Sequence, residues 1–262
     1  MENFENNFSY TPLPVNPTEN VSESSIKQPE IVEPNRTIQP EEIEKWNSDG
    51  YKVETYGPDV SVVVLGEYHY DKDMKAKQVE LIKAIKPEFV LYEGLSGFVY
   101  DPTKKSLERQ EGRLFMDGYD GEHFKSPKEM EFINVITSSA DEVGCNVVGC
   151  DLTFAEQGQV GKELAKSNPD KYIFDEEFNV LQRRDNPNYT ILGTDIEYIK
   201  ARDNKMAEMI IEYQKKSQKP IVVIVGNRHA SNIHDQKKLQ EQGFGYVYIS
   251  PTKPATKSGM YS

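Results

Sequence analysis

The feature that most constrains the fold is a series of short apolar runs separated by longer segments with helical periodicity. Polar residues hardly interrupt these runs, as is typical of strands buried on both faces of a sheet. Buried strands that alternate with helices predict an α/β protein. The expected strands are residues 60–65, 89–93, 146–151, 221–226 and 246–250.

The segments between these runs carry helix signals. Apolar positions in residues 74–85 recur at helical spacing and stop before Pro87. Capping boxes at Ser126-Pro127-Lys128-Glu129 and at Thr194-Asp195-Ile196-Glu197 predict two further helices. We therefore expect a largely parallel central sheet flanked by helices, with a short helix at residues 40–46 preceding the sheet.

The chain divides unevenly. Residues 1–39 are rich in proline and glutamate and poor in aliphatic residues, so we expect a disordered acidic tail. Residues 40–252 should form one α/β domain, followed by a flexible C-terminus at 253–262. Two insertions, at about 95–125 and 155–193, are long enough to form a lid or a small helical lobe.

Charge and hydropathy narrow the classes of partner. The net charge of −12 argues against binding to nucleic acid, because phosphate contacts need a basic surplus. No apolar stretch reaches the roughly 20 residues of a membrane span. The first ten residues show no signal pattern, so we expect a cytoplasmic protein in which Cys145 and Cys150 are free thiols. The sequence does not indicate the oligomeric state.

Chemically versatile residues follow four of the expected strands. The carboxyl ends of parallel strands meet at one edge of a sheet, where ligands bind. Charged residues after one strand are commonly solvated loop residues, but four such ends, with Gly-x-x-His occurring twice, favour a site. The four segments are Gly66-Glu67-Tyr68-His69, Tyr92-Glu93-Gly94, Cys150-Asp151 and Gly226-Asn227-Arg228-His229.

The long helix after Thr194 contains a second anomaly. Its apolar seam has Asp203 at one position, with Arg202 beside it. A charged pair at a buried seam needs partners. Either this pair is an internal ion pair that holds the helix on the sheet, or Arg202 reaches the carboxylates at the strand ends. His234 is interpreted as a surface residue.

Together these motifs resemble the TraB/TIKI, erythromycin-esterase and ChaN-like group. The similarity covers roughly residues 58–250 and consists of Gly-Glu-x-His, an acidic residue closing the second strand, the Arg-Asp pair and the second Gly-x-x-His. Asn227-Arg228 stands where a small pair such as Gly-Ala is usual. The resemblance implies a hydrolase-like site, with metal-dependent peptide cleavage, metal-free ester cleavage and haem or iron binding in different branches.

Two imidazoles and a carboxylate also suit a divalent metal on chemical grounds. We expect metal-assisted cleavage of an amide or ester in a small molecule or peptide, with Mn, Co, Zn or Fe at His69, Glu93 and His229. A metal-independent esterase is the second choice. A haem or metal carrier and a catalytically inactive interaction module are the alternatives. The expected catalytic residues are Glu67, His69, Glu93, Arg202 and His229, and the expected substrate-binding residues are Tyr68, Asp151 and Arg228.

Overall fold

The computed structural model describes residues 37–47, 50–69, 71–116, 127–190 and 195–252. These residues belong to one compact unit that begins at Pro34. Ile38 is buried, and its N–H donates to the Val60 carbonyl at 2.7 Å. The folded part therefore starts before Pro40, while residues 1–36 of the expected tail and the expected C-terminal segment 253–262 lie outside the described residues.

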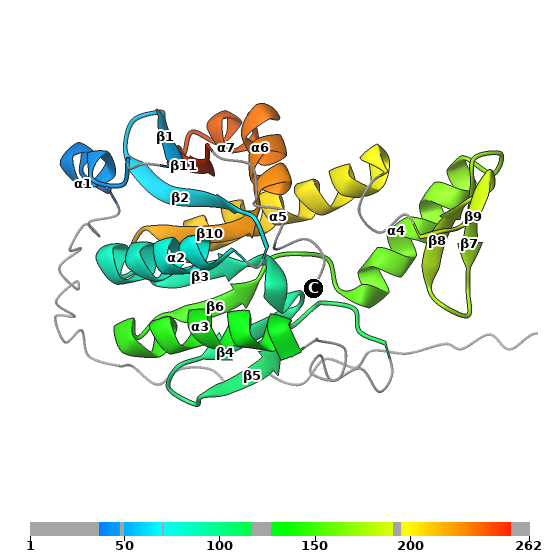
Figure 1. Cartoon of the computed structure of the whole chain (residues 1–262), viewed down its shortest axis with the longest axis horizontal. Coiled ribbons are helices and arrows are strands. Elements are labelled where there is room, and N and C mark those ends of the chain that lie inside the picture. The colour runs from blue at the N-terminus through cyan, green and yellow to red at the C-terminus, as the bar shows by residue number, and fades with distance from the viewer. Residues whose placement is uncertain (1–36, 48–49, 70, 117–126, 191–194, 253–262) are drawn as a thin grey trace, which may run out of the picture. The chain divides into compact units, whose positions relative to one another are not determined.

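An eight-stranded sheet forms the centre of the domain, in the order β1-β11-β2-β10-β3-β6-β4-β5 (Figure 1). Five neighbouring strands in this order are parallel: β11, β2, β10, β3 and β6. Their bounds are Gly245–Pro251, Val60–Glu67, Ile221–Gly226, Phe89–Tyr92 and Asn146–Gly149.

The sheet is mixed, so the expectation of a largely parallel sheet is correct only for its central part. At one edge, β1 (Tyr51–Tyr56) runs antiparallel to β11. At the other edge, β4 (Phe98–Asp101) and β5 (Ser106–Arg109) form a hairpin that pairs antiparallel with β6. A hairpin needs only a short turn, whereas each parallel pair needs a crossover, and the first insertion supplies such a hairpin.

Helices cover both faces of the sheet (Figure 1). The alternation of side chains along a strand sends Val62 and Val64 of β2 to one face and Val63 and Leu65 to the other. The first face packs on α5 (Ile196–Lys216) and α6 (Asn227–Asp235). The opposite face packs on α2 (Lys72–Ile85) and α3 (Pro127–Val143), which also contact each other.

Side-chain caps fix where two of these helices begin. The Asp71 carboxylate accepts from the N–H of Asp73 at 2.9 Å and starts α2. Asp195 accepts from the N–H of Glu197 at 3.1 Å and starts α5, so Asp195 and not Thr194 is the cap. Each carboxylate satisfies an amide that the first turn leaves without a helical partner.

The second insertion does not form a purely helical lobe. It contains α4 (Phe154–Ser167) and a separate three-stranded antiparallel sheet of β7 (Tyr172–Asp175), β8 (Val180–Arg183) and β9 (Asn186–Thr190). Tyr172 and Leu181 of this sheet pack with Tyr198 of α5 in a small apolar cluster. A role of either insertion as a lid stays a prediction.

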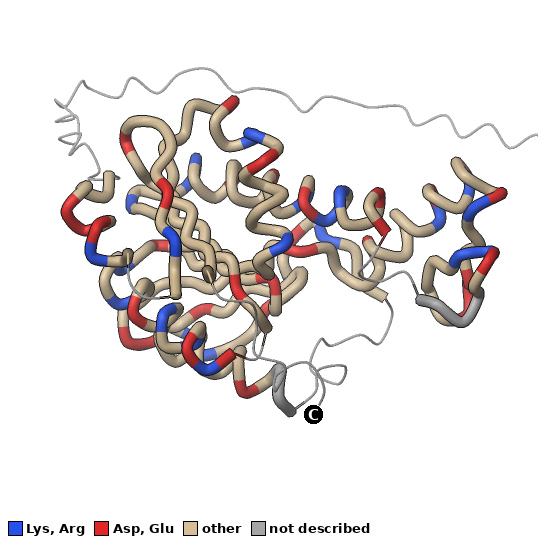
Figure 2. Tube along the Cα trace, turned by 45° about the horizontal axis from the view of Figure 1, so that its top comes forward, with Lys and Arg blue, Asp and Glu red and all other residues tan. Residues whose placement is uncertain are grey.

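The short elements complete the domain. They are α1 (Pro40–Glu44), the 3₁₀ helix η1 (Glu93–Leu95) and α7 (Lys238–Glu241). In the described residues no helix combines the length and the apolar character that crossing a membrane requires. Lys and Arg lie among Asp and Glu along the helices (Figure 2).

Strand register determines where the functional side chains appear. Gly226 at the end of β10 pairs with Glu67 at the end of β2. Tyr92 at the end of β3 pairs with Gly149 at the end of β6. The parallel strands β2, β10, β3 and β6 are consecutive in the sheet, so their carboxyl ends lie side by side.

Candidate active site

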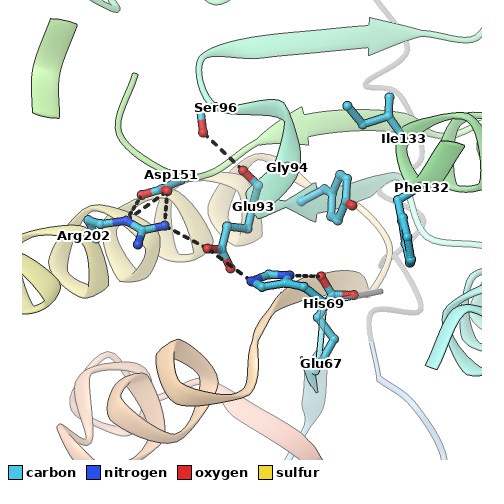
Figure 3. A pocket seen from close by; sticks show the side chains of 10 residues that line it. Glu67, His69, Glu93, Gly94, Ser96, Phe132, Ile133, Asp151 and Arg202 are labelled. Atoms are coloured by element: carbon cyan, nitrogen blue, oxygen red, sulfur yellow. Dashed lines mark hydrogen bonds and ion pairs between the residues drawn. The ribbon is translucent and has the colours of Figure 1, made fainter. Parts of the chain in front are cut away.

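Glu93 occupies the centre of the site at these strand ends (Figure 3). Its side chain is buried, and each carboxylate oxygen has an N–H donor: Arg202 Nη2 donates to Oε1 at 2.8 Å, and the Gly226 amide donates to Oε2 at 2.6 Å. Two imidazole nitrogens also face Oε1, at 4.0 Å for His69 Nε2 and 3.7 Å for His229 Nε2. The guanidinium of Arg202 and the imidazoles of His69 and His229 therefore all lie near Glu93 Oε1.

Arg202 of α5 joins Glu93 to Asp151. Its Nε donates to Asp151 Oδ2 at 3.0 Å, and its Nη2 donates to the same oxygen at 2.5 Å. The Leu152 N–H donates to the other Asp151 oxygen at 2.7 Å. The two hydrogen bonds from Arg202 to Asp151 fix the plane of the guanidinium. Arg202 therefore binds the carboxylates of both Asp151 and Glu93.

His69 contacts the carboxylate of Glu67, which in turn accepts a hydrogen bond from Gln78. Glu67 is buried, and its Oε1 lies 3.1 Å from His69 Nδ1. Its Oε2 accepts a hydrogen bond from Gln78, a buried residue of α2. The hydrogen bond to Glu67 raises the pKa of His69 to about 9, since it outweighs the opposing effect of burial. His69 is therefore mainly an imidazolium at neutral pH.

His229 forms a second histidine–carboxylate pair. Its Nδ1 lies 2.6 Å from Asp203 Oδ1, and Asn232 Nδ2 donates to the other Asp203 oxygen at 2.8 Å. Asp203 and His229 are both buried. A carboxylate at Nδ1 favours the tautomer with its proton on that nitrogen, so in the neutral form of His229 the lone pair lies on Nε2, which faces Glu93.

Gly226 permits the close approach of these groups. A Cβ at this position would lie 3.2 Å from His69 Nε2 and 3.3 Å from Glu93 Oε2. Both distances are tighter than ordinary van der Waals contact. The glycine of the second Gly-x-x-His motif therefore leaves room for the backbone amide to bind Glu93 directly.

Electrostatics favour the charged forms of Glu93 and Arg202, and burial opposes that of Asp151. Burial alone would raise the pKa of Glu93, but the charges of His229, His69 and Arg202 outweigh it and lower that pKa. Burial opposes the charge of Arg202, yet its two carboxylate partners raise the pKa of the guanidinium. Burial also raises the pKa of the Asp151 carboxyl, with Arg202 acting in the opposite direction.

A cavity of about 240 Å³ opens at this edge of the sheet. Charged groups line one side, and the side chains of Phe132 and Ile133 line another (Figure 3). Tyr92, which packs with Ile133, is also part of the lining. The lining residues are Glu67, His69, Tyr92, Glu93, Gly94, Ser96, Phe132, Ile133, Asp151 and Arg202.

The surroundings of Glu93 fit a metal ion poorly. A metal would have to share Oε1 with the Arg202 guanidinium, a cation already bonded to it, and Oε2 with the Gly226 amide. Within the part of the chain that the structure describes, no group of three histidine, cysteine, aspartate or glutamate side chains is arranged to hold a metal. The donor set is thus better suited to binding protons and polar substrate atoms.

The structure brings together most of the residues expected at the site. Glu67, His69, Glu93, Asp151 and Arg202 line the cavity, and His229 lies 3.7 Å from Glu93. Three expected residues are not among those that line it: His229 is buried beside Glu93, Tyr68 is half-buried and Arg228 is exposed on α6. A role of Tyr68 and Arg228 in substrate binding stays a prediction.

Sequence reasoning gave no site role to Gln78, Asp203, Asn232 or Phe132. Of these residues only Asp203 stood out in the sequence, as a carboxylate on an apolar helical seam. The structure shows that it pairs with His229 and not with Arg202.

His234, expected at the surface, is half-buried, with its ring 5.2 Å from that of Tyr248 and its Nδ1 2.7 Å from the Tyr246 hydroxyl.

Comparison of the chain with protein-family models, with curated proteins and with solved structures gives no match. The resemblance to the TraB/TIKI, erythromycin-esterase and ChaN-like group therefore stays a prediction.

Proposed function

We propose that this protein is a hydrolase that cleaves an ester or amide with water activated by a histidine. The observation that carries the proposal is the convergence of two histidine–carboxylate pairs on one oxygen of Glu93. Each pair uses Nδ1 for its own carboxylate and leaves Nε2 facing the common point. Such a pair orients an imidazole for proton transfer.

His229 is the proposed general base. With its Nδ1 proton directed to Asp203, its Nε2 has a lone pair 3.7 Å from Glu93 Oε1. One water can bond to both atoms at this separation, because each contact needs only about 2.8 Å. The water oxygen attacks the substrate carbonyl carbon, and its proton passes to His229 Nε2.

His69 is the proposed general acid. Its pKa of about 9 keeps it protonated at neutral pH, and its side chain lines the cavity. As the tetrahedral intermediate collapses, the bond from carbon to the leaving oxygen or nitrogen breaks. That atom takes the proton from His69 Nε2. The proposed reaction starts with His69 protonated and His229 neutral, as acid and base catalysis requires.

Arg202 supplies the proposed stabilisation of the oxyanion. Its Nε and Nη2 are occupied by Asp151 and Glu93, while the structure gives Nη1 no partner among the described residues. A fixed donor that is not otherwise used can receive the negative charge that develops on the carbonyl oxygen.

The metal-assisted route that the sequence favours is the alternative mechanism for the same reaction. It would use His69, Glu93 and His229 as ligands, and it requires Arg202 to leave Glu93. The presence of that guanidinium supports the route without metal.

The proposal is tested by measuring hydrolysis of p-nitrophenyl acetate and of acyl p-nitroanilides by the full chain, before and after treatment with a chelator. We expect turnover that persists in chelator and that is abolished in His69→Ala and His229→Ala. His234→Ala is the matched control, since this histidine packs on tyrosines away from the cavity. Turnover lost on chelation and restored by Mn, Co, Zn or Fe would establish the metal route, and equal activity in all variants would refute the site.

A further inference from the structure

We propose that the acyl group bound in this cavity is small, uncharged and apolar. This inference rests on the proposed function, because it assigns the cleaved carbonyl to the Glu93 side of the cavity and the acyl chain to the opposite wall. Three properties of the cavity support it: its apolar wall, its charge balance and its size.

The apolar wall is built by Tyr92 and by two neighbouring residues of α3. Side chains alternate along β3, so Leu91 packs toward α5 while Tyr92 packs toward α3 with Ile133. Phe132 and Ile133 lie across the cavity from Arg202 (Figure 3). A chain that extends from a carbonyl near Glu93 toward α3 meets hydrocarbon and aromatic surface.

The charge balance of the lining excludes an anionic acyl group. With Glu67, Glu93 and Asp151 all counted as ionised, the lining carries three negative charges against the two positive charges of His69 and Arg202. The net charge is −1, and Arg202 already binds two of the carboxylates. A substrate carboxylate would therefore lose its hydration in a negatively charged pocket, where the Arg202 guanidinium is already bonded to Glu93 and Asp151.

Lys75 lies beside the apolar wall, but it does not change this balance. Its Nζ lies 3.5 Å from the centroid of the Phe132 ring. The same Nζ forms an ion pair with Glu131 at 2.9 Å. The ammonium and this carboxylate cancel, so the wall itself stays neutral.

Cavity size limits the acyl group. At about 240 Å³ the cavity is smaller than the roughly 300–1,000 Å³ of pockets for drug-sized ligands. Hydrolysis also converts a neutral substrate into a carboxylate product. The negative lining that excludes an anionic substrate then favours release of that product.

The test compares binding of three amides of equal chain length to the full chain, followed by amide chemical shifts in NMR titrations. Hexanamide ends in a methyl group, adipamate ends in a carboxylate, and 6-aminohexanamide ends in an ammonium. We expect hexanamide to bind at least tenfold more tightly than adipamate, which the negative lining repels. It should also bind at least tenfold more tightly than 6-aminohexanamide, because the apolar wall would strip water from the ammonium without giving it a partner. Propanamide, which lacks three methylenes, should bind more weakly by up to about fourfold for each buried CH₂.

Substitution of Phe132 tests whether the acyl chain lies against the apolar wall. Phe132→Ala should weaken binding of hexanamide about tenfold or more and leave binding of propanamide within twofold. Phe89→Ala is the matched control, because Phe89 is an aromatic residue that packs against Tyr213 outside the cavity. Retained propanamide binding also shows that a variant is folded.

The outcomes separate this inference from the proposed function. Binding of hexanamide without turnover of any ester or amide supports the acyl assignment and refutes the hydrolase. Turnover with adipamate or 6-aminohexanamide bound as tightly as hexanamide supports the hydrolase and overturns the acyl assignment. Absence of hexanamide binding at millimolar concentration also overturns it.

Discussion

Arg202 and Glu93 are 109 positions apart in the chain, and the guanidinium of one donates to the carboxylate of the other at 2.8 Å. The same guanidinium nitrogen also reaches Asp151 at 2.5 Å. Both carboxylates are buried, so each needs this partner to remain charged within the protein. The pairing ties α5 to the ends of β3 and β6.

Arg202→Met should destabilise the fold strongly. The substitution keeps most of the side-chain volume but leaves Glu93 and Asp151 without their shared cation. We expect the free energy of unfolding, measured in urea, to fall by about 3–5 kcal/mol, as for other broken buried ion pairs. Arg183→Met removes an exposed partner of Asp185 and should cost less than about 1 kcal/mol. Equal losses would show that the buried pairing adds no stability.

His69 should titrate with a pKa of about 9 in the folded protein, as measured from its ring proton shifts by NMR. Glu67→Gln should lower this pKa toward the ordinary value of about 6.5, because the hydrogen bond to Glu67 is the main cause of the shift. An unchanged pKa in that variant would mean that Glu67 does not hold His69 in solution.

The raised pKa of His69 also predicts how stability depends on pH. The folded state binds this proton more tightly than the unfolded chain does, so the protonated pair stabilises the fold. That contribution is fully present below about pH 6.5 and is lost as the pH rises through about 9. Denaturation of the wild type and of His69→Ala at several pH values checks this, and the variant should lose less stability across that interval.

Gln78→Met should destabilise the protein although Gln78 lies outside the cavity lining. It removes the donor to Glu67 Oε2 and leaves a buried carboxylate oxygen without its partner. The expected loss is about 1–3 kcal/mol. Gln159→Met, on the exposed side of α4, is the control and should change stability by less than about 0.5 kcal/mol. A loss no larger than in the control would contradict the assignment of Gln78 as a support for Glu67.

Asp203→Asn should impair hydrolysis more than it impairs folding. The amide offers His229 no negative charge and permits the wrong tautomer, so the proposed base would lose its lone pair at Nε2. General-base catalysis is worth about 10²–10⁴-fold, and we expect kcat to fall within that range at the optimal pH. Asp185→Asn, at an exposed carboxylate, serves as the control. A kcat within twofold of wild type would remove Asp203 from the mechanism.

Local sequence was sufficient to predict the central strands and the helices between them. Val60 to Leu65 form a strand buried on both faces because the run is almost entirely aliphatic and rich in β-branched residues, which suit that environment. Glu67, Glu93 and Asp151 were expected to meet for a topological reason: they follow consecutive buried strands, and parallel strands end at one edge. The structure places all three around one cavity.

The pairings that give the site its chemistry depend on tertiary structure alone. Which edge strands run antiparallel is set by contacts between distant segments, such as Val99 with Val148. Asp203 could have paired with any nearby cation, and only the packing of α5 against α6 brings it to His229. The sequence supplied the residues at each strand end, but the direction of each side chain depends on the turn that follows and on the helix packed over it.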